Sequence, residues 1–360
     1  MTQKLHRRLI IAGAIAALGI PAAINAGPAF AASATSAGHA HLSVRVFASG
    51  SATVFGPDDI TWLDGTVYVV WQNGIGPSGQ PSTTGATASD VIGYSASGHR
   101  VATWKVKGHA DGLTADAATH QLLITVNEDG NSSLFAISPE APAGAQVHHY
   151  QFNLNPLPHG GGTDAVSVDH GVILISASAP TTANGPAVYR ADLDGSVAVL
   201  QPVLFDNSTA TVANRNSSSY GTQVALALTD PDSNTVVPAV SPRFGGDFML
   251  DSQGDEQQIY VDGAAGSTPR LWALNLSQSV DDTAWATDSK GTLLVTDGVD
   301  NEIFAVGGAF DPGTAYVAVT PGDADVPINH PNYLGRLDLR TGQVTTVVTT
   351  IQAKGLLFVP

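Results

Sequence analysis

One motif recurs along the sequence and constrains the fold more than any other feature. An aspartate stands directly before a short apolar run, turn residues follow, and a second apolar run completes the unit. Two short runs separated by turn residues are typical of β-hairpins. The unit is clearest in 279–297, with the turn Asp-Ser-Lys-Gly, and it recurs in 58–70, 110–125, 163–175 and, more loosely, 246–261. We therefore expect 279–297 to form a hairpin and the chain to be built from repeated β units.

The spacing of the units predicts how they are assembled. The first three start at Asp59, Asp111 and Asp164, 52 and 53 residues apart, which leaves room for about four strands in each unit. No convincing amphipathic helix follows the first 32 residues. This pattern predicts an all-β fold, a single β-propeller with six blades. A pair of β-sandwiches is the structural alternative.

Both ends of the predicted propeller domain, 41–360, contain strand-like runs. The run 355–359 resembles an innermost strand without a hairpin partner, and 41–49 alternates like a strand. We expect the ring to close by joining these N- and C-terminal strands, which removes an exposed sheet edge.

The regular spacing breaks at about 206–242, which we interpret as an insertion. Within it, Asp230-x-Asp232-x-Asn234 matches the first half of a calcium loop but lacks the later glycine and glutamate. A polar turn and a minor Ca²⁺ loop both remain open for this segment.

The N-terminus has the pattern of a secretory signal peptide. Lys4, Arg7 and Arg8 precede an apolar run over 9–20, and Ala29-Phe30-Ala31 fits a cleavage site. We expect residues 1–31 to be removed and 32–40 to be a flexible lead-in. The mature protein is predicted to be secreted, monomeric and free of the membrane.

Composition excludes several kinds of chemistry. The chain has no cysteine, so thiol catalysis and thiolate metal ligands are ruled out. Its formal net charge is −16, which repels nucleic acid and anionic membranes and attracts cations. The expected partner is a small molecule or a protein ligand.

The unit pattern resembles the six-bladed propellers of the NHL and SMP-30 (gluconolactonase-like) superfamily, and also secreted propellers of actinobacterial type. The resemblance rests on the aspartate before each inner strand and on the run Leu-Leu-Val-Thr-Asp at 293–297. Its closest local matches are Gly108-His109-Ala110-Asp111-Gly112-Leu113 and 354–359. It covers most of the mature chain as architecture, although a shared propeller fold does not determine function.

In a propeller of this superfamily, the loop that enters each innermost strand lies at one mouth of the central channel. The resemblance therefore implies a ring of acids at that mouth, formed by Asp59, Asp111, Asp164, Asp247 and Asp282. It also implies one divalent cation, Ca²⁺ or another hard ion, with Asn127 and Asn301 as the available amides; no other cofactor is expected. Alternatively, each aspartate caps its own blade by accepting hydrogen bonds from nearby backbone N–H groups.

Two histidines fall on the same kind of loop as the acids. His109 and His159 precede Asp111 and Asp164, and a histidine beside a carboxylate can act as a general acid or base. Alternatively, each is a loop histidine bound to a backbone carbonyl. The sequence contains no G-x-S-x-G, H-E-x-x-H or P-loop motif.

Two functions of different classes are compatible with these features. The first is a propeller that binds a ligand or partner without chemistry, and the sequence favours it slightly. The alternative is a metal (Ca²⁺)-dependent hydrolase of a lactone or small ester.

Overall fold

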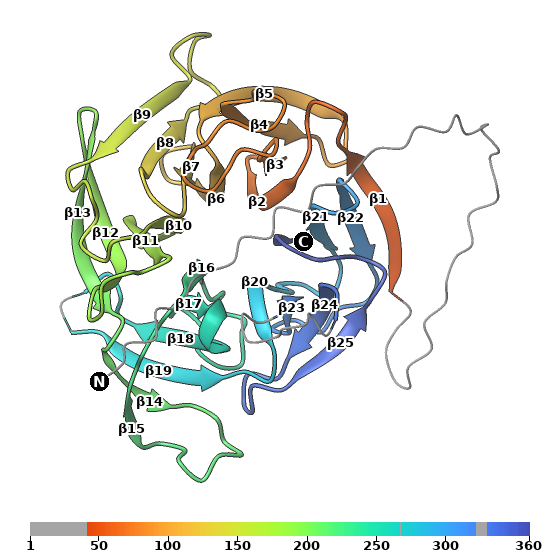
Figure 1. The fold of residues 1–360 in the computed structure, drawn as a ribbon. Coiled ribbons are helices and arrows are strands. Elements are labelled where there is room, and N and C mark those ends of the chain that lie inside the picture. The colour runs from red at the N-terminus through yellow and green to blue at the C-terminus, as the bar shows by residue number, and fades with distance from the viewer. Residues whose placement is uncertain (1–41, 267, 322–329) are drawn as a thin grey trace. The chain divides into compact units, whose positions relative to one another are not determined.

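The computed structural model describes residues 42–266, 268–321 and 330–360, and these residues form an all-β propeller (Figure 1). The predicted signal peptide and lead-in lie outside the described residues. In the described part, strands are interrupted by one short 3₁₀ helix, η1 (Gln253–Asp255). None of the helical residues described there forms a segment long and apolar enough to cross a membrane.

The first three sets of strands each follow the same simple order, from the axis outwards. The first sheet contains β2 (Pro57–Leu63), β3 (Thr66–Trp71), β4 (Ala88–Tyr94) and β5 (Arg100–Lys107). The second set contains β6 (Ala110–Asp116), β7 (Gln121–Val126), β8 (Ser133–Ile137) and β9 (Val147–Phe152). The third contains β10 (Gly162–Asp169), β11 (Val172–Ser178), β12 (Pro186–Asp194) and β13 (Val197–Phe205). A short parallel contact between β13 and β9 joins the second and third sets into one sheet.

The next sheet carries two extra strands on its outer edge. Its main strands are β16 (Pro231–Val236), β17 (Phe248–Ser252), β18 (Gln257–Asp262) and β19 (Arg270–Asn275). The extra strands are β14 (Thr209–Val212) and β15 (Gln223–Ala225), which extend the sheet beyond β19. The segment interpreted as an insertion thus supplies β14, β15 and the innermost strand β16. Neither the polar turn nor the calcium loop is formed at 230–234.

The last two sheets exchange strands along the chain. One contains β20 (Ser279–Trp285), β23 (Ala315–Thr320), β24 (Tyr333–Leu337) and β25 (Val344–Val348). The other contains β26 (Leu356–Val359), β21 (Thr292–Asp297), β22 (Glu302–Gly307) and β1 (Ser43–Ser49). The two sheets lie side by side in Figure 1, and the chain passes between them repeatedly.

This exchange corrects the predicted hairpin at 279–297. β20 pairs with β23, from Ser279 with Thr320 to Trp285 with Ala315, while β21 pairs with β22 and β26. Both runs are strands, as expected, but they belong to different sheets. The apolar residues of β20 and β21 are buried in their separate sheets. The sequence pattern therefore identifies each run as a strand but does not show which strand it pairs with.

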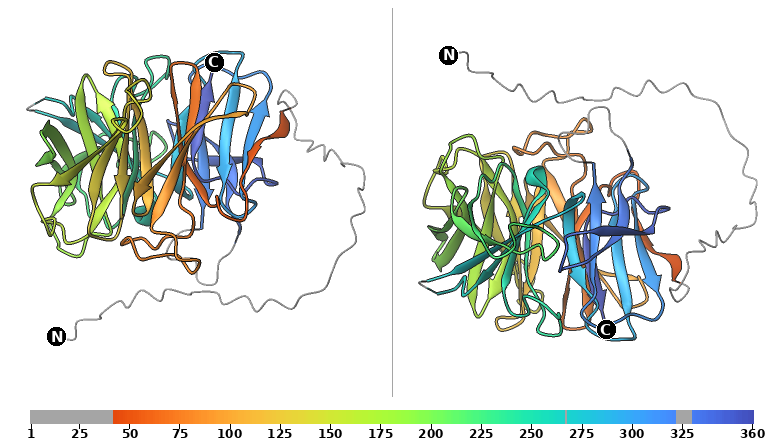
Figure 2. Two further views of the ribbon diagram at one scale, coloured as in Figure 1. Left: turned by 90° about the horizontal axis from the view of Figure 1, so that it is seen from above. Right: turned by 90° about the horizontal axis from the view of Figure 1, so that it is seen from below.

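The prediction of an all-β propeller closed by both ends of the chain is confirmed. β1 pairs with β22 and β26 pairs with β21, so the two terminal strands belong to one sheet. The innermost strands around the axis are β2, β6, β10, β16, β20 and β26, of which the first five are labelled in Figure 1. Figure 2 shows the sheets of the propeller from two sides.

The core consists of apolar layers between neighbouring sheets. Val70 of β3 and Ile124 of β7 are fully buried in one such layer, and Trp71 packs with Leu294 and Ile303 in the layer that joins the first sheet to the closing sheet. Burial of this kind contributes about 25 cal/mol per Å² of apolar surface and supplies the main stabilisation of a chain without disulfides.

Glycines mark the places where innermost strands approach each other most closely. A Cβ on Gly112 of β6 would lie 2.5 Å from the Cα of Ala165, and one on Gly355 would lie 2.4 Å from the Asp58 carbonyl oxygen. Larger residues would push the strands apart at these points. The close approach brings the residue that precedes each glycine to the mouth of the channel.

Candidate functional site

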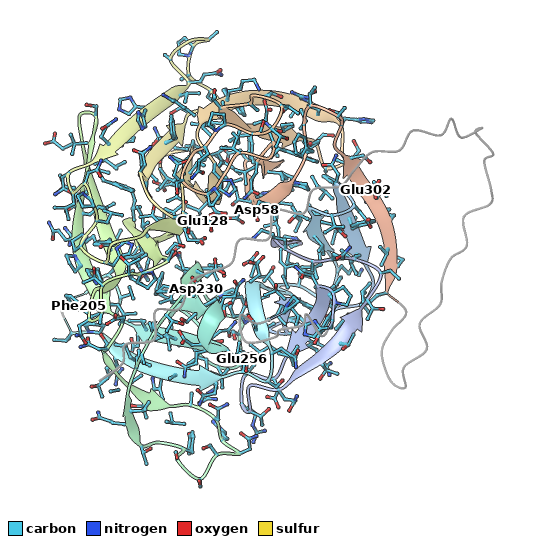
Figure 3. All side chains as sticks on the ribbon, viewed as in Figure 1. Asp58, Glu128, Phe205, Asp230, Glu256 and Glu302 are labelled. Atoms are coloured by element: carbon cyan, nitrogen blue, oxygen red, sulfur yellow. The ribbon has the colours of Figure 1, made fainter. Side chains whose placement is uncertain are left out.

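The innermost strands place one charged residue each at the same mouth of the channel. An aspartate is the second residue of β2, β6 and β16 and the third residue of β10 and β20, whereas a lysine, Lys354, stands two residues before β26. These residues line a cavity of about 260 Å³: Asp58, Asp111, Asp164, Asp232, Asp281 and Lys354. We call this set the charged ring. Figure 3 shows Asp58 and Glu128 beside the central opening.

Irregular pairing at the start of each strand directs these side chains. The antiparallel register shifts at the aspartate in β2, β6, β10, β16 and β20. A β-bulge adds a residue to one strand and re-aims its side chain. The bulge therefore presents the aspartate to the channel while the following apolar residues keep their places in the core.

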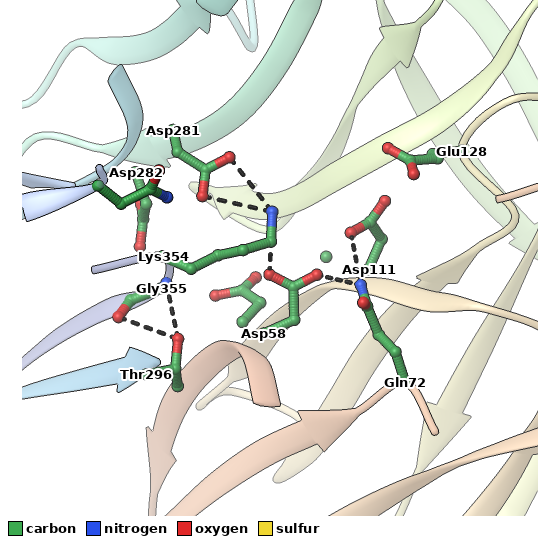
Figure 4. Close-up of polar contacts among 12 residues, drawn as sticks. Asp58, Gln72, Asp111, Glu128, Asp281, Asp282, Thr296, Lys354 and Gly355 are labelled. Atoms are coloured by element: carbon green, nitrogen blue, oxygen red, sulfur yellow. Dashed lines mark hydrogen bonds and ion pairs between the residues drawn. The ribbon is translucent and has the colours of Figure 1, made fainter. Parts of the chain in front are cut away.

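Lys354 supplies the one positive charge of the ring. Its Nζ lies 3.2 Å from Asp281 Oδ1 and 3.3 Å from Asp58 Oδ1, so the ammonium group bridges two carboxylates (Figure 4). On the other side of Asp58, the Gln72 side-chain amide donates to Asp58 and lies 3.4 Å from Asp111 Oδ1. One half of the ring is thus neutralised from within the protein.

Burial favours the protonated form of several carboxyl groups at this mouth, in the charged ring and in Glu128 beside it. Burial raises the pKa of Asp58 to about 8 despite Lys354, and burial with the nearby Glu128 raises that of Asp111 to about 6. Burial likewise raises the pKa of Glu128 to about 7. Burial and the nearby Asp232 raise the pKa of Asp164, and burial and the nearby Asp281 raise that of Asp232, both well above the usual range. Such a cluster favours either protons or a metal cation.

The raised pKa values predict an unusual dependence of stability on pH. In the unfolded chain these groups titrate near pH 4, whereas Asp111, Glu128 and Asp58 in the folded chain titrate near 6, 7 and 8. The folded state binds more protons across this window, so the free energy of unfolding should fall as the pH rises from about 4 to about 8. We expect the melting temperature in metal-free buffer to decrease from pH 5 to pH 8.

The double variant Asp58→Asn with Glu128→Gln is the matched control for this titration, because it removes two of the groups. Its melting temperature should depend less on pH than that of the wild type. A wild-type melting temperature that is constant or rises between pH 5 and pH 8 would contradict the assigned pKa shifts.

One group of side chains has the composition of a metal site. Single ligand atoms of His109, Asp111 and Glu128 all lie within 4.8 Å of one another. His109 Nδ1 lies 2.7 Å from the carbonyl oxygen of Ile75. Because a carbonyl only accepts, Nδ1 carries the proton, and His109 Nε2 is left with a lone pair 3.6 Å from Glu128 Oε1.

Three buried side-chain oxygens at this mouth lack a hydrogen-bond partner among the described residues, namely Ser233 Oγ and one oxygen each of Asp111 and Asn234. Asp111 is 7% exposed and its Oδ2 is unpartnered, as is Oδ1 of Asn234, which is 8% exposed. All three residues line the cavity. Buried polar atoms are normally satisfied, so free oxygens in a carboxylate-rich cavity fit the oxygen ligands of a hard cation.

The sequence-predicted acids are brought together only in part. Asp111 and Asp164 belong to the charged ring. Asp59 and Asp282 also line the cavity, but their carboxylates accept hydrogen bonds of 2.6 Å from the backbone N–H groups of Leu113 and Leu356. These bonds link each aspartate's innermost strand to a neighbouring one, whereas the alternative proposed capping within the same blade; Oδ1 of each aspartate also accepts from the next N–H of its own strand, at Ile60 and Thr283.

Asp247 lies elsewhere. It precedes β17, the second strand of its sheet, and does not line the cavity; its charged neighbours are Asp262 and Arg270. The equivalent ring position in this sheet is Asp232, at the start of β16. The sequence unit was assigned to the wrong strand because its innermost strand is the polar segment Pro-Asp-Ser-Asn-Thr-Val.

His159 is held within the fold and does not line the cavity. It is fully buried, with Nδ1 2.7 Å from the Tyr189 hydroxyl and Nε2 2.7 Å from the Gly162 carbonyl oxygen. Asn127 is also engaged, because its Oδ1 accepts from the backbone of His109 and its Nδ2 donates to Asn131. Asn301 accepts from the backbone of Gly56.

Sequence reasoning did not place several members of the site at the mouth of the channel, although it considered Asp232 and Asn234 as part of a separate calcium loop. They are Asp58, Asp281, Asp232, Lys354, Glu128, Gln72 and Asn234. A usable signal was present, because Asp58, Asp111 and Asp164 are equally spaced, whereas Asp59 is one residue out of step. The ring position of β26 is likewise visible in Lys-Gly-Leu, which parallels Asp-Gly-Leu at 111–113.

The sequence matches no family model, and no curated protein matches it. Comparison with solved structures finds propellers of low sequence identity. A protein of unknown function from Bacteroides caccae is 9% identical, with 84% of this chain and 86% of that chain covered and a TM-score of 0.48.

Two enzymes are among the similar structures. The periplasmic gluconolactonase of Pseudomonas aeruginosa is 15% identical, covering 84% of this chain and 88% of that chain with a TM-score of 0.46. A streptogramin B lyase is 12% identical, covering 88% of this chain and 94% of that chain with a TM-score of 0.45.

Proposed function

We propose that the protein is a propeller that binds a divalent cation, Ca²⁺ in the first place, at its acidic mouth and uses that site to hold a small ligand. The observation that carries the proposal is Asp111 Oδ2, an unpartnered oxygen on a buried carboxylate beside Glu128 and His109. A cation there would take the place of the protons that these carboxyls otherwise retain.

The donor set defines the chemistry of the ion. Asp111 and Glu128 offer oxygens, the ligands that Ca²⁺ prefers, and His109 Nε2 adds a nitrogen that would favour Mn²⁺ or Zn²⁺. The formal net charge of −16 supports attraction of cations to the protein. The predicted export signal supports a location outside the cell, where Ca²⁺ modules bind with Kd values of about 10⁻⁴ to 10⁻³ M.

The test is a thermal melt in metal-free buffer and with Ca²⁺. At a free concentration of 100 times Kd, a ligand specific for the folded state stabilises it by about 2.7 kcal/mol. We expect this stabilisation to raise the melting temperature of the wild type. The double variant Asp111→Asn with Asp164→Asn should show no such rise. Parallel melts with Mn²⁺ and Zn²⁺ measure the contribution of His109.

Asp247→Asn is the matched control, since it removes an aspartate that lies outside the cavity. It should keep the full response to Ca²⁺. No rise in wild type with any of the three ions, or an equal rise in the double variant, would refute a cation site at this mouth.

A metal-dependent hydrolase of lactones or small esters is the second candidate. It is favoured by His109, whose Nδ1 is engaged by the Ile75 carbonyl, so that Nε2 lies beside Glu128 and could accept a proton if the carboxylates alone hold the ion. A panel of lactones assayed with the stabilising ion tests this function. Turnover that His109→Gln abolishes would support it, whereas no turnover of any lactone leaves binding alone as the proposal.

A further inference from the structure

A second cavity lies at the end of the propeller opposite the charged ring. It has a volume of about 570 Å³. β16 starts near the mouth with Asp232, and the loop after its other end supplies Arg243 to this cavity. β20 likewise starts with Asp281 near the mouth and ends at Trp285, whose partner Ala315 lines the cavity.

This cavity gathers a large share of the positive charge of the protein. Four of the 15 lysine and arginine residues line it, although the chain is acidic overall: Arg215, Arg243, Arg336 and Arg340. The ion pairs found among the described residues, all within 4.0 Å, involve none of these four arginines. We call them the arginine cluster.

Arg243 is fixed at the base of the cluster. Its Nη1 donates to the Leu339 carbonyl at 2.6 Å and its Nη2 to the Ala213 carbonyl at 2.7 Å, and its guanidinium stacks on Phe244 at 4.4 Å. Burial and the neighbouring Arg215 lower the pKa of Arg243, because both make its positive charge less favourable. Two carbonyls use only part of its five N–H donors.

The backbone holds two further arginines together. The N–H of Arg215 donates to the carbonyl of Arg340 at 2.7 Å, although the residues come from different sheets. Asp338 also lines the cavity, but its carboxylate accepts from the Arg340 N–H at 2.8 Å and the Thr341 hydroxyl at 2.9 Å within a turn. That carboxylate is engaged by the turn rather than by a guanidinium.

From these contacts we infer that the arginine cluster is a binding site for the oxyanion group of a small molecule, a carboxylate or a phosphate. Guanidinium groups bind both anions through paired N–H donors, which gives strong and oriented hydrogen bonds. The hydroxyls of Thr314 and Thr345, which also line the cavity, would contact the uncharged part of such a ligand. The site is separate from the cation site at the mouth.

The experiment is isothermal titration calorimetry in metal-free buffer at constant ionic strength, with inorganic phosphate, citrate and, for comparison, chloride. We expect phosphate or citrate to bind and chloride to give no heat, and the stronger of the two identifies the anion class. Arg336→Gln and Arg340→Gln should each weaken binding about tenfold or more, the effect of one lost charge-assisted contact. Both side chains are at least partly exposed, so the variants should remain folded.

Arg190→Gln is the matched control, because Arg190 pairs with Asp192 on β12, outside the cavity. It should bind the anion as wild type does, and so should Asp111→Asn, since the mouth is not involved. Absence of binding by wild type, or equal weakening in Arg190→Gln, would overturn the inference without bearing on the cation site.

Discussion

Leu356→Asp should destabilise the protein by about 4 kcal/mol or more, which is a large part of the stability of a typical domain. Leu356 is 5% exposed in β26 and belongs to the apolar layer with Phe310 and Phe358. Its backbone N–H donates to Asp282 Oδ2, so the new carboxylate would be buried close to an existing one. Urea denaturation followed by tryptophan fluorescence measures the loss.

Val101→Asp is the control for this change. Val101 is 59% exposed on β5, so the same carboxylate remains in water and should change the free energy of unfolding little. If Leu356→Asp had the same urea midpoint as Val101→Asp, β26 would not be the strand that closes the propeller.

The second large effect is expected for Lys354→Met, which keeps the length of the side chain and removes its charge. Asp58 and Asp281 would then face each other without the ammonium group. Loss of one partner from a buried ion pair costs about 3–5 kcal/mol, but the Lys354 side chain is 39% exposed and water screens part of the charge. We expect a loss of about 2 kcal/mol at pH 8 in metal-free buffer.

Added Ca²⁺ should stabilise Lys354→Met more than wild type, because an internal cation no longer competes for the carboxylates. Lys105→Met is the control, since Lys105 pairs with Asp90 but is 67% exposed. Equal melting temperatures of the two variants in metal-free buffer would show that Lys354 does not neutralise the ring. Lys354→Arg, which retains the charge, should lie near wild type.

The sequence predicted which segments form strands better than it predicted which strands pair with each other. Apolar or alternating runs near turn residues identified β1, β26 and most innermost strands, because such runs leave a clear local pattern. The exchange of β21 and β23 between the last two sheets was not predictable. Strand pairing at that point depends on contacts between residues far apart in the chain, which local pattern does not contain.

The local sequence also does not show which individual residues face the channel. Asp58 and Asp59 are adjacent and chemically identical, yet one faces Lys354 and the other binds the backbone of Leu113. A bulge decides which of the two faces the channel, and a shift of one residue reverses the assignment. Asp232 was interpreted as part of a turn or calcium loop rather than of an innermost strand, since its strand is polar enough to resemble a loop.

The strand exchange also determines where the ring is mechanically strongest. The chain crosses between the last two sheets three times, after β20, after β22 and after β25. Other neighbouring sheets are joined by a single crossing, such as the connection from β5 to β6. A protease that cut one of the three crossings would leave two covalent links, besides the packing between the sheets. The two sheets should therefore open as one cooperative unit, and a nicked ring would part first at a joint with a single crossing.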